Sequence, residues 1–224
     1  MLRPHIFFFS GIDGSGKSTH ARLLYVYARR NNLKVLYVWL RWSPLLTYIL
    51  LFYSLILKRT LKITFTREGR RTIFKIHIFW VDPVLKRLFP RFLLFDSLIK
   101  YFFKVIIAYI RYLDLIIFDR YFLDVIVDLL WETRNSRIFR YAETKAILGL
   151  INKQKHCGLV FFANPSAVID RKTDIISIKE IKFKYNIFKI LAKELNLETR
   201  DTTSVPPSVT FNAVKECFCR CVRS

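Results

Sequence analysis

Acidic residues are scarce in this 224-residue chain. It carries 17 Asp and Glu against 38 Lys and Arg, which gives a formal net charge of +21. A field of this sign concentrates polyanions at the protein surface, so nucleotides, nucleic acids and anionic membranes are all compatible partners. The charge alone does not choose among them, and it carries no information about the fold.

The chain also lacks internal repeats, low-complexity tracts and any linker rich in Pro, Gly or Ser. These absences argue against a second domain and against disorder. With 53% hydrophobic residues there is ample material for a core, and 224 residues fall within the range of one growing core. We therefore predict a single domain over residues 1–224.

No uncharged run is as long as a membrane-spanning helix requires. The longest, residues 42–57, has 16 residues and includes Pro44, whereas a span needs about 20. We interpret it as a buried or interfacial helix, and contact with a membrane surface stays open as the less favoured alternative. Residues 91–112, rich in aromatic and basic side chains, predict a helix with one core face and snorkelling charges.

Cysteine is rare as well. Cys157 stands alone, and Cys217, Cys219 and Cys221 supply three sulfurs at a spacing unlike that of zinc sites. We predict free thiols near the chain end. The N-terminal apolar run is interrupted at once by glycines, unlike the apolar run of a secretion signal. Free thiols and the lack of such a signal favour a reducing cytoplasm. The four histidines lack metal-ligand or catalytic-triad spacing, and we assign them no role.

Glycine is the most telling scarcity, because three of only six glycines fall in the stretch GIDGSGKST. This stretch satisfies the phosphate-loop pattern G-x-x-x-x-G-K-[ST] between an apolar run and a helical pattern. Glycines let the backbone turn its N–H groups toward phosphate oxygens, and the lysine adds a point charge. We predict that the loop binds ATP through residues Gly11, Ile12, Asp13, Gly14, Ser15, Gly16, Lys17, Ser18 and Thr19.

Apolar runs without alternation predict buried strands at 5–10, 34–40, 113–119 and 158–164, with a weaker strand at 196–201. Helical patterns separate them, which indicates a mostly parallel five-stranded sheet flanked by helices. This is the α/β three-layer fold of P-loop NTPases. Ser177 and Glu180 form a capping-box pattern that starts a helix over about 178–195, and a further helix begins near Pro207.

A phosphate loop requires a second metal support, usually a carboxylate at the end of a neighbouring strand. The run LDLIIFDR ends in Asp119, followed by Arg120. We therefore predict a Mg²⁺ site at Ser18 and Asp119, with Arg120 able to reach phosphates.

These residues resemble those of the thymidylate kinase family. Residues 7–30 look like its opening segment, and 115–121 look like its Asp-Arg-Tyr segment. Residues 163–174 are similar to its strand, short helix and arginine-bearing lid, and 200–209 resemble the closing segment that passes the adenine of ATP. The resemblance implies ATP- and Mg²⁺-dependent phosphoryl transfer to a nucleoside monophosphate, in nucleotide biosynthesis, by a homodimer.

The resemblance also implies roles for particular residues on the acceptor side. Asp13 matches a carboxylate that contacts the acceptor sugar, and Arg41 matches an arginine that grips the acceptor phosphate. Arg120 and Tyr121 match the Asp-Arg-Tyr segment beside the transferring group.

On the lid, placed around 170–177, Arg171 and Lys172 match the family's cations. Ser15 is neutral, as in members whose catalytic cation comes from the lid. We therefore predict that Lys17, Arg120 and Arg171 are the catalytic cations, with Arg171 stabilising the transition state.

The acceptor side departs from the family pattern. WSP follows Arg41 where the family has Glu-Pro-Gly, and no thymine-reading residues follow Tyr121. Asp124 and Asp128 are four residues apart and share a helix face. They either recognise acceptor hydroxyls, which would add Asp124 to the acceptor site, or are acids favoured by the helix dipole.

Three hypotheses follow. The first is a thymidylate kinase that converts dTMP to dTDP, and the second is a kinase of the same fold with another acceptor. The third is a basic nucleotide-binding protein whose partner is nucleic acid or a membrane surface. We rank the third lowest, because polyanionic substrates also suit a basic protein.

Overall fold

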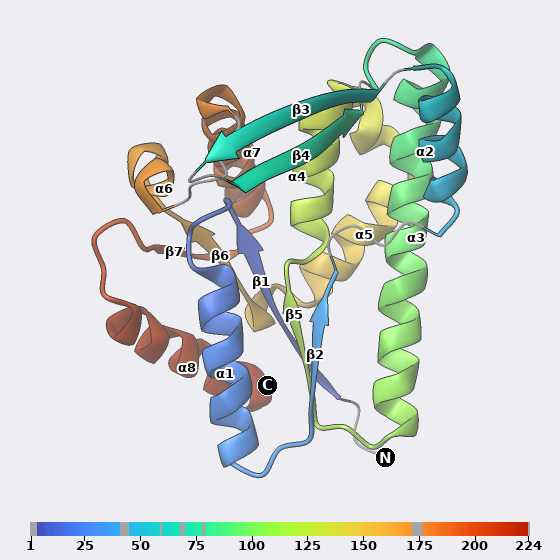
Figure 1. Ribbon diagram of the computed structural model, residues 1–224. Coiled ribbons are helices and arrows are strands. Elements are labelled where there is room, and N and C mark those ends of the chain that lie inside the picture. Colours follow the sequence, from blue (N-terminus) through green and yellow to red (C-terminus); the bar gives the residue numbers. More distant parts are fainter. Residues whose placement is uncertain are drawn as a thin grey trace.

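The computed structural model describes residues 4–40, 45–58, 60–67, 70–77, 79–171 and 177–223. Figure 1 shows a sheet lying between layers of helices. The strands are β1 His5–Gly11, β2 Val35–Trp39, β3 Thr60–Arg67, β4 Arg70–His77, β5 Leu115–Asp119, β6 Gly158–Phe162 and β7 Glu198–Asp201. The α-helices are α1 Lys17–Arg30, α2 Thr47–Ile56, α3 Pro83–Ile110, α4 Phe122–Thr133, α5 Ala142–Lys153, α6 Pro165–Arg171, α7 Ile178–Glu194 and α8 Pro207–Arg223.

The main sheet has the order β2-β5-β1-β6-β7, and every pairing in it is parallel. Its five strands are the five predicted from the sequence, so the α/β three-layer fold is confirmed. β1 lies at the centre. Phe9 in β1 pairs with Asp119 in β5, so the loop after β1 and the predicted metal carboxylate emerge at the same carboxyl edge.

Helices cover both faces of this sheet, which explains why its strands are apolar without alternation. Phe7 and Phe9 point into a core beneath α1 and α8, where they pack with Leu24 and Phe218. Phe8, between them in the strand, belongs to the larger core on the other face under α3, α4, α5 and α7. A polar residue on either side of β1 would therefore be buried.

The two best-marked helices are confirmed. The Ser177 hydroxyl accepts the N–H of Glu180 at 3.4 Å and caps α7, which ends at Glu194. α8 opens at Pro207, where a missing N–H costs nothing.

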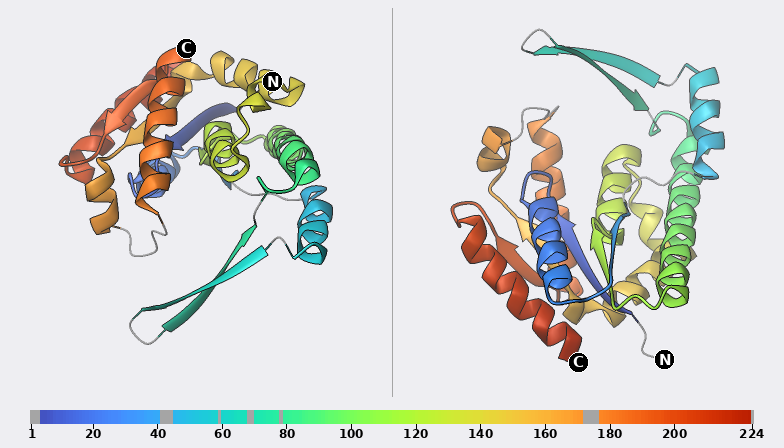
Figure 2. Two further views of the ribbon diagram at one scale, coloured as in Figure 1. Left: turned by 90° about the horizontal axis from the view of Figure 1, so that it is seen from above. Right: turned by 60° about the horizontal axis from the view of Figure 1, so that its bottom comes forward.

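Between β2 and β5 the chain adds α2, a hairpin and the long helix α3. The hairpin pairs β3 with β4 antiparallel, from Thr60 opposite His77 to Arg67 opposite Arg70. It projects from the body on the side of the sheet's carboxyl edge (Figures 1 and 2). These two strands were not predicted from the sequence, because charged residues interrupt their apolar pattern.

Asp96 interrupts the apolar pattern of α3, as an exposed acid does, but it is only 2% exposed. Its carboxylate accepts the backbone N–H groups of Leu45, Leu46 and Thr47 at 2.9–3.1 Å and the Thr47 hydroxyl at 2.7 Å. Asp96 therefore caps the N-terminus of α2, whose own Leu46 provides no side-chain cap. Its hydrogen-bond donors lie about 50 residues away in the sequence, so the local sequence pattern does not reveal that Asp96 is buried.

The prediction of free thiols near the chain end is wrong for Cys221, which forms a disulfide with Cys157. It is correct for Cys217 and Cys219. Burial raises the pKa of the Cys217 thiol to about 12, with a further contribution from Glu198. In the described parts of the chain no three His, Cys, Asp or Glu side chains gather as a metal site.

Of the helices in the described ranges, none combines the length and the apolar character needed to cross a bilayer. The helix predicted within residues 42–57, as buried or interfacial, is α2, with ten residues and no charge. Many apolar side chains of α2 and α3 are exposed. The prediction that the aromatic residues of 91–112 form one core face is therefore only partly correct.

Candidate functional site

The glycine loop takes the conformation that its sequence predicts. Gly11 has φ +134°, and a Cβ placed there would lie 2.0 Å from the carbonyl oxygen of Phe161 in β6. Gly16, with φ +84°, turns the chain into α1. Both positions exclude side chains, because L-residues rarely adopt such angles and Gly11 has no room for a Cβ.

α1 begins at Lys17 with no side-chain cap and no acid in its first turn, so its terminal N–H groups face the loop. Lys17 is 4% exposed, and its Nζ donates to the carbonyls of Gly11 at 2.5 Å and Ile12 at 2.6 Å. A helix N-terminus beside a buried lysine is a positive environment suited to phosphate.

Four charged side chains meet at this loop: Asp13 of the loop itself, Lys17 of α1, Arg120 between β5 and α4, and Asp124 of α4. The Arg120 guanidinium lies 2.6 Å from Asp13 Oδ1 and 3.8 Å from Asp124 Oδ1. Lys17 Nζ lies 3.8 Å from Asp13 and 3.7 Å from Asp124. Burial raises the pKa of Asp124, although Lys17 and Arg120 oppose the shift. The structure thus brings together Asp13, Lys17, Arg120 and Asp124, as predicted for one site.

Asp119 is buried at the end of β5, and its Oδ2 accepts the Tyr37 hydroxyl at 2.6 Å. Burial, followed by the contact with Asp119, raises the pKa of Tyr37. Asp119 Oδ1 is buried without a hydrogen-bond partner in the described residues. An unpartnered carboxylate oxygen fits Mg²⁺, which takes one or two protein ligands and completes its shell with phosphate and water. Ser18, half-buried in the first turn of α1, is the predicted second ligand.

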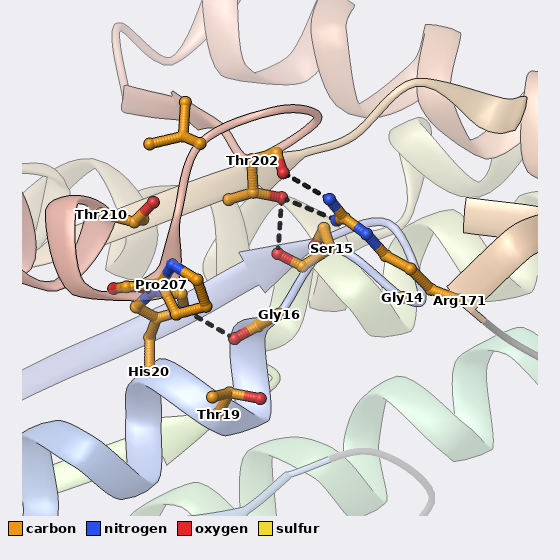
Figure 3. Close-up of a pocket in the computed structure, with 10 residues that line it drawn as sticks. Gly14, Ser15, Gly16, Thr19, His20, Arg171, Thr202, Pro207 and Thr210 are labelled. Carbon is orange, nitrogen blue, oxygen red and sulfur yellow. Dashed lines mark hydrogen bonds between the residues drawn. The ribbon is translucent and has the colours of Figure 1, made fainter. Parts of the chain in front are cut away.

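A pocket of about 390 Å³ opens beside the loop (Figure 3). It joins the loop, α1, α6 and the segment leading into α8. Its lining residues are Gly14, Ser15, Gly16, Thr19, His20, Arg171, Thr202, Val205, Pro207 and Thr210. The segment expected to pass the adenine therefore shares a pocket with the loop expected to hold the phosphates.

Hydrogen bonds fasten these walls together. The Thr202 hydroxyl donates to the carbonyl of Ser15 at 3.0 Å (Figure 3). The buried His20 ring has Nδ1 2.8 Å from the Gly16 carbonyl and Nε2 3.3 Å from the Pro207 carbonyl. Sequence reasoning assigned His20 nothing, and its position three residues after the loop lysine was the available signal.

Arg171 lies in this pocket, with its guanidinium donating to the carbonyls of Thr202 and Thr203, each at 2.7 Å. Figure 3 shows it at the wall formed by Thr202. In this arrangement it supports the adenine-side segment. Arg41, Lys172 and most of the predicted lid lie outside the described residues.

Tyr121, predicted to contact the acceptor, needs a correction. Its ring is fully buried and stacks on Phe8 with centroids 4.5 Å apart. Its hydroxyl donates to Gln154 at 2.5 Å. The side chain belongs to the core because the chain turns into α4 at this residue, and its backbone N–H donates to Asp124 Oδ2 at 3.2 Å.

Asp124 and Asp128, which were predicted from the sequence to share one face of a helix, have different environments. Asp128 pairs with the buried Lys184 of α7 at 2.6 Å, and Lys184 also pairs with Glu180 at 2.6 Å. Asp128 therefore fastens α4 to α7, whereas Asp124 faces the loop lysine.

No protein-family model matches the chain, and no curated protein matches it either. The functional assignment consequently depends on the residues and geometry described above.

Proposed function

We propose that the protein is an ATP- and Mg²⁺-dependent kinase that transfers a phosphoryl group to a nucleoside monophosphate. One observation carries the proposal: the glycine loop and the uncapped first turn of α1 form one wall of the pocket through Gly14, Ser15, Gly16 and Thr19. Lys17 is buried next to this wall. The segment around Thr202 and Pro207 forms the other wall. Such a pocket suits a ligand with a phosphate chain at one end and a flat base at the other.

In this proposal the N–H groups of the loop and of α1 donate to phosphate oxygens, and Lys17 supplies a point charge to the outer phosphates. Mg²⁺, held by Ser18 and Asp119, would neutralise charge between those phosphates. Arg120 adds positive charge beside the transferring group, and Arg171 acts there only if it leaves the carbonyls of Thr202 and Thr203. Catalysis depends on positioning and charge rather than on a covalent intermediate.

On the acceptor side, Asp13 and Asp124 would provide carboxylate oxygens that accept hydrogen bonds from substrate hydroxyl groups. The resemblance makes dTMP the first acceptor to test. Two observations favour a second candidate, a kinase of the same fold for a different acceptor. The Tyr121 side chain is in the core, and Asp124 is surrounded by Lys17 and Arg120 rather than presented to a base.

The resemblance also implies a homodimer, which light scattering would measure.

We assign the protein to the cytoplasm, where ATP is available. The Cys157–Cys221 disulfide is unusual in a reducing cytosol. Thiol labelling of freshly lysed cells therefore tests that assignment, and full protection of both cysteines would count against it.

The first experiment measures ADP release with ATP and Mg²⁺ against nucleoside monophosphates, nucleosides and phosphosugars. Lys17→Ala is the blank and the exposed Lys189→Ala is the matched control. We expect acceptor-dependent turnover that falls by about 10²–10³-fold in Lys17→Ala and is unchanged in the control.

Turnover with dTMP well above the rest would support thymidylate kinase activity, and turnover with another compound would support the second candidate. Silence with every acceptor would contradict both kinase proposals. It would favour the nucleotide-binding protein instead.

A further inference from the structure

Tyr37 and Asp119 lie on neighbouring strands and on the same face of the main sheet. β2 and β5 pair in parallel, with Tyr37 opposite Ile117 and Trp39 opposite Asp119. Side chains two residues apart along a strand share a face, so Tyr37 lies diagonally beside Asp119. Ile117 and Tyr37 both belong to the core beneath α1 and α8. The tyrosine therefore lies beside the predicted metal carboxylate, on the side of the sheet where α1 carries Ser18.

The hydroxyl group of Tyr37 has one proton to donate, and the structure directs it to Asp119. The distance from the hydroxyl oxygen to Asp119 Oδ2 is 2.6 Å. Burial and Asp119 raise the pKa of Tyr37, whereas Arg22 of α1 opposes them through a hydrogen bond and its charge. A guanidinium only donates hydrogen bonds, so Arg22 uses a lone pair of this oxygen and leaves the proton to the carboxylate. The ring is held as well, because Tyr25 of α1 packs edge-on against it with centroids 6.2 Å apart.

The two oxygens of Asp119 differ as a result. Oδ2 accepts the tyrosine proton, whereas Oδ1 is buried without a hydrogen-bond partner in the described parts of the chain. A buried carboxylate oxygen without a partner costs free energy, and a cation offsets that cost. Asp119 therefore offers a single oxygen to a metal ion.

Magnesium and calcium ions differ in what they require of such a carboxylate. Mg²⁺ keeps a small octahedral shell, retains several waters and takes one oxygen from each carboxylate that binds it. Ca²⁺ takes a larger and more flexible shell and often binds both oxygens of one carboxylate. A carboxylate whose second oxygen is already engaged suits Mg²⁺ better than Ca²⁺.

We propose that Tyr37 is a positioning residue that makes the metal site selective for Mg²⁺ over Ca²⁺, by engaging Oδ2 of Asp119 and leaving Oδ1 for the ion. The inference rests on the proposed function, because it takes Asp119 as a ligand of the Mg²⁺ that accompanies ATP. It goes beyond that function, since the presence of a carboxylate does not by itself determine which cation binds. Tyr37 acts through Asp119 and has no contact with the reacting atoms in this role.

The test compares the binding of ATP with different metal ions. Isothermal titration calorimetry measures the dissociation constant of ATP for the full chain in EDTA, in Mg²⁺ and in Ca²⁺, with no acceptor present. We define the metal preference as the dissociation constant in Ca²⁺ divided by that in Mg²⁺. In the wild type we expect a preference of about tenfold or more.

Tyr37→Phe removes the hydroxyl group and keeps the ring. Because both oxygens of Asp119 are then free to bind an ion, we expect the metal preference to fall by about tenfold. The dissociation constant in EDTA should stay within about twofold of the wild type, since no metal takes part in it. Tyr25→Phe is the matched control: its ring packs against Tyr37 from α1, and its metal preference should equal that of the wild type. Melting temperatures confirm that both variants are folded.

A double-mutant cycle attributes the effect to Asp119. Asp119→Asn should abolish the metal preference, because it removes the negative charge that binds the ion. Tyr37→Phe should cause no further change in that background, since its action depends on the carboxylate.

An unchanged metal preference in Tyr37→Phe overturns the inference. So does an equal loss of affinity in EDTA, Mg²⁺ and Ca²⁺, which would give the tyrosine a purely structural role, or an additive effect in Asp119→Asn. The expected metal preferences without turnover on any acceptor would contradict the proposed kinase and support the role of Tyr37. Absence of ATP binding in the wild type would contradict both.

Discussion

The loop side and the acidic side of the sheet's carboxyl edge are built in different ways. On the loop side, Gly11 and Gly16 hold backbone angles that exclude side chains, and the walls are fastened mainly through carbonyl groups. On the acidic side, Asp13, Arg120 and Asp124 form the site through charged side chains. The loop side has no room for an added side-chain atom at Gly11, whereas the stability of the acidic side depends on the charges of its side chains.

The largest effect should come from adding one methyl group to the loop side. Gly11→Ala places a Cβ 2.0 Å from the Phe161 carbonyl at a φ of +134°, so we expect a loss of about 3–5 kcal/mol in unfolding free energy. Urea denaturation measures it. Gly149→Ala is the matched control, because nothing lies within 4 Å of its added Cβ and the helix should gain about 0.5–1 kcal/mol. Equal effects at the two glycines would show that the loop side tolerates an added methyl group as well as α5 does.

Next in size is the disulfide that fastens α8, whose first residue lines the pocket. Cys157 and Cys221 are 64 residues apart, so breaking the bond should cost about 2–4 kcal/mol. We expect Cys157→Ser to lower the melting temperature and to abolish any further effect of a reductant. Cys219→Ser, which leaves the bond intact, should melt like the wild type. A wild type insensitive to reductant would contradict this prediction.

The acidic side should respond to pH through Asp124. Its folded pKa is raised above the ordinary value of 3.8, so the folded state holds a proton that the unfolded chain releases. The wild type should therefore lose stability relative to Asp124→Asn as the pH rises from 3.8 through the folded pKa. Urea midpoints of both proteins across that window measure the difference, and parallel curves would exclude Asp124 as the source.

The smallest effect should come from one hydrogen bond between the pocket walls. Thr202→Val keeps the shape but removes the hydroxyl, which lies 3.0 Å from both the Ser15 and the Phe162 carbonyl oxygens, at a cost of about 1 kcal/mol. A rise in the KM for ATP, with the KM for the acceptor unchanged, would place Thr202 on the ATP side. Ser208→Ala, at an exposed position of α8, is the control.

What the sequence predicted follows from how local each feature is. The five strands of the main sheet and the glycine loop were predictable, because apolar runs and glycine spacing lie within a few residues. Asp96 was not, since its partners are Leu45, Leu46 and Thr47 on another helix. Nor was the Cys157–Cys221 pairing. Tyr121 failed for a related reason: whether a ring at a strand end faces a site or a core depends on neighbours such as Phe8.

The hairpin β3–β4 enters and leaves the body at adjacent points, because Thr60 and His77 are paired and α2 is fastened to α3 by Asp96. In evolutionary terms the β3–β4 hairpin is therefore an insertion that can change independently of the rest of the fold. It can lengthen, shorten or disappear by a local change in the gene while the order of the five parallel strands stays the same. Related chains should therefore vary most in length between residues 60 and 77.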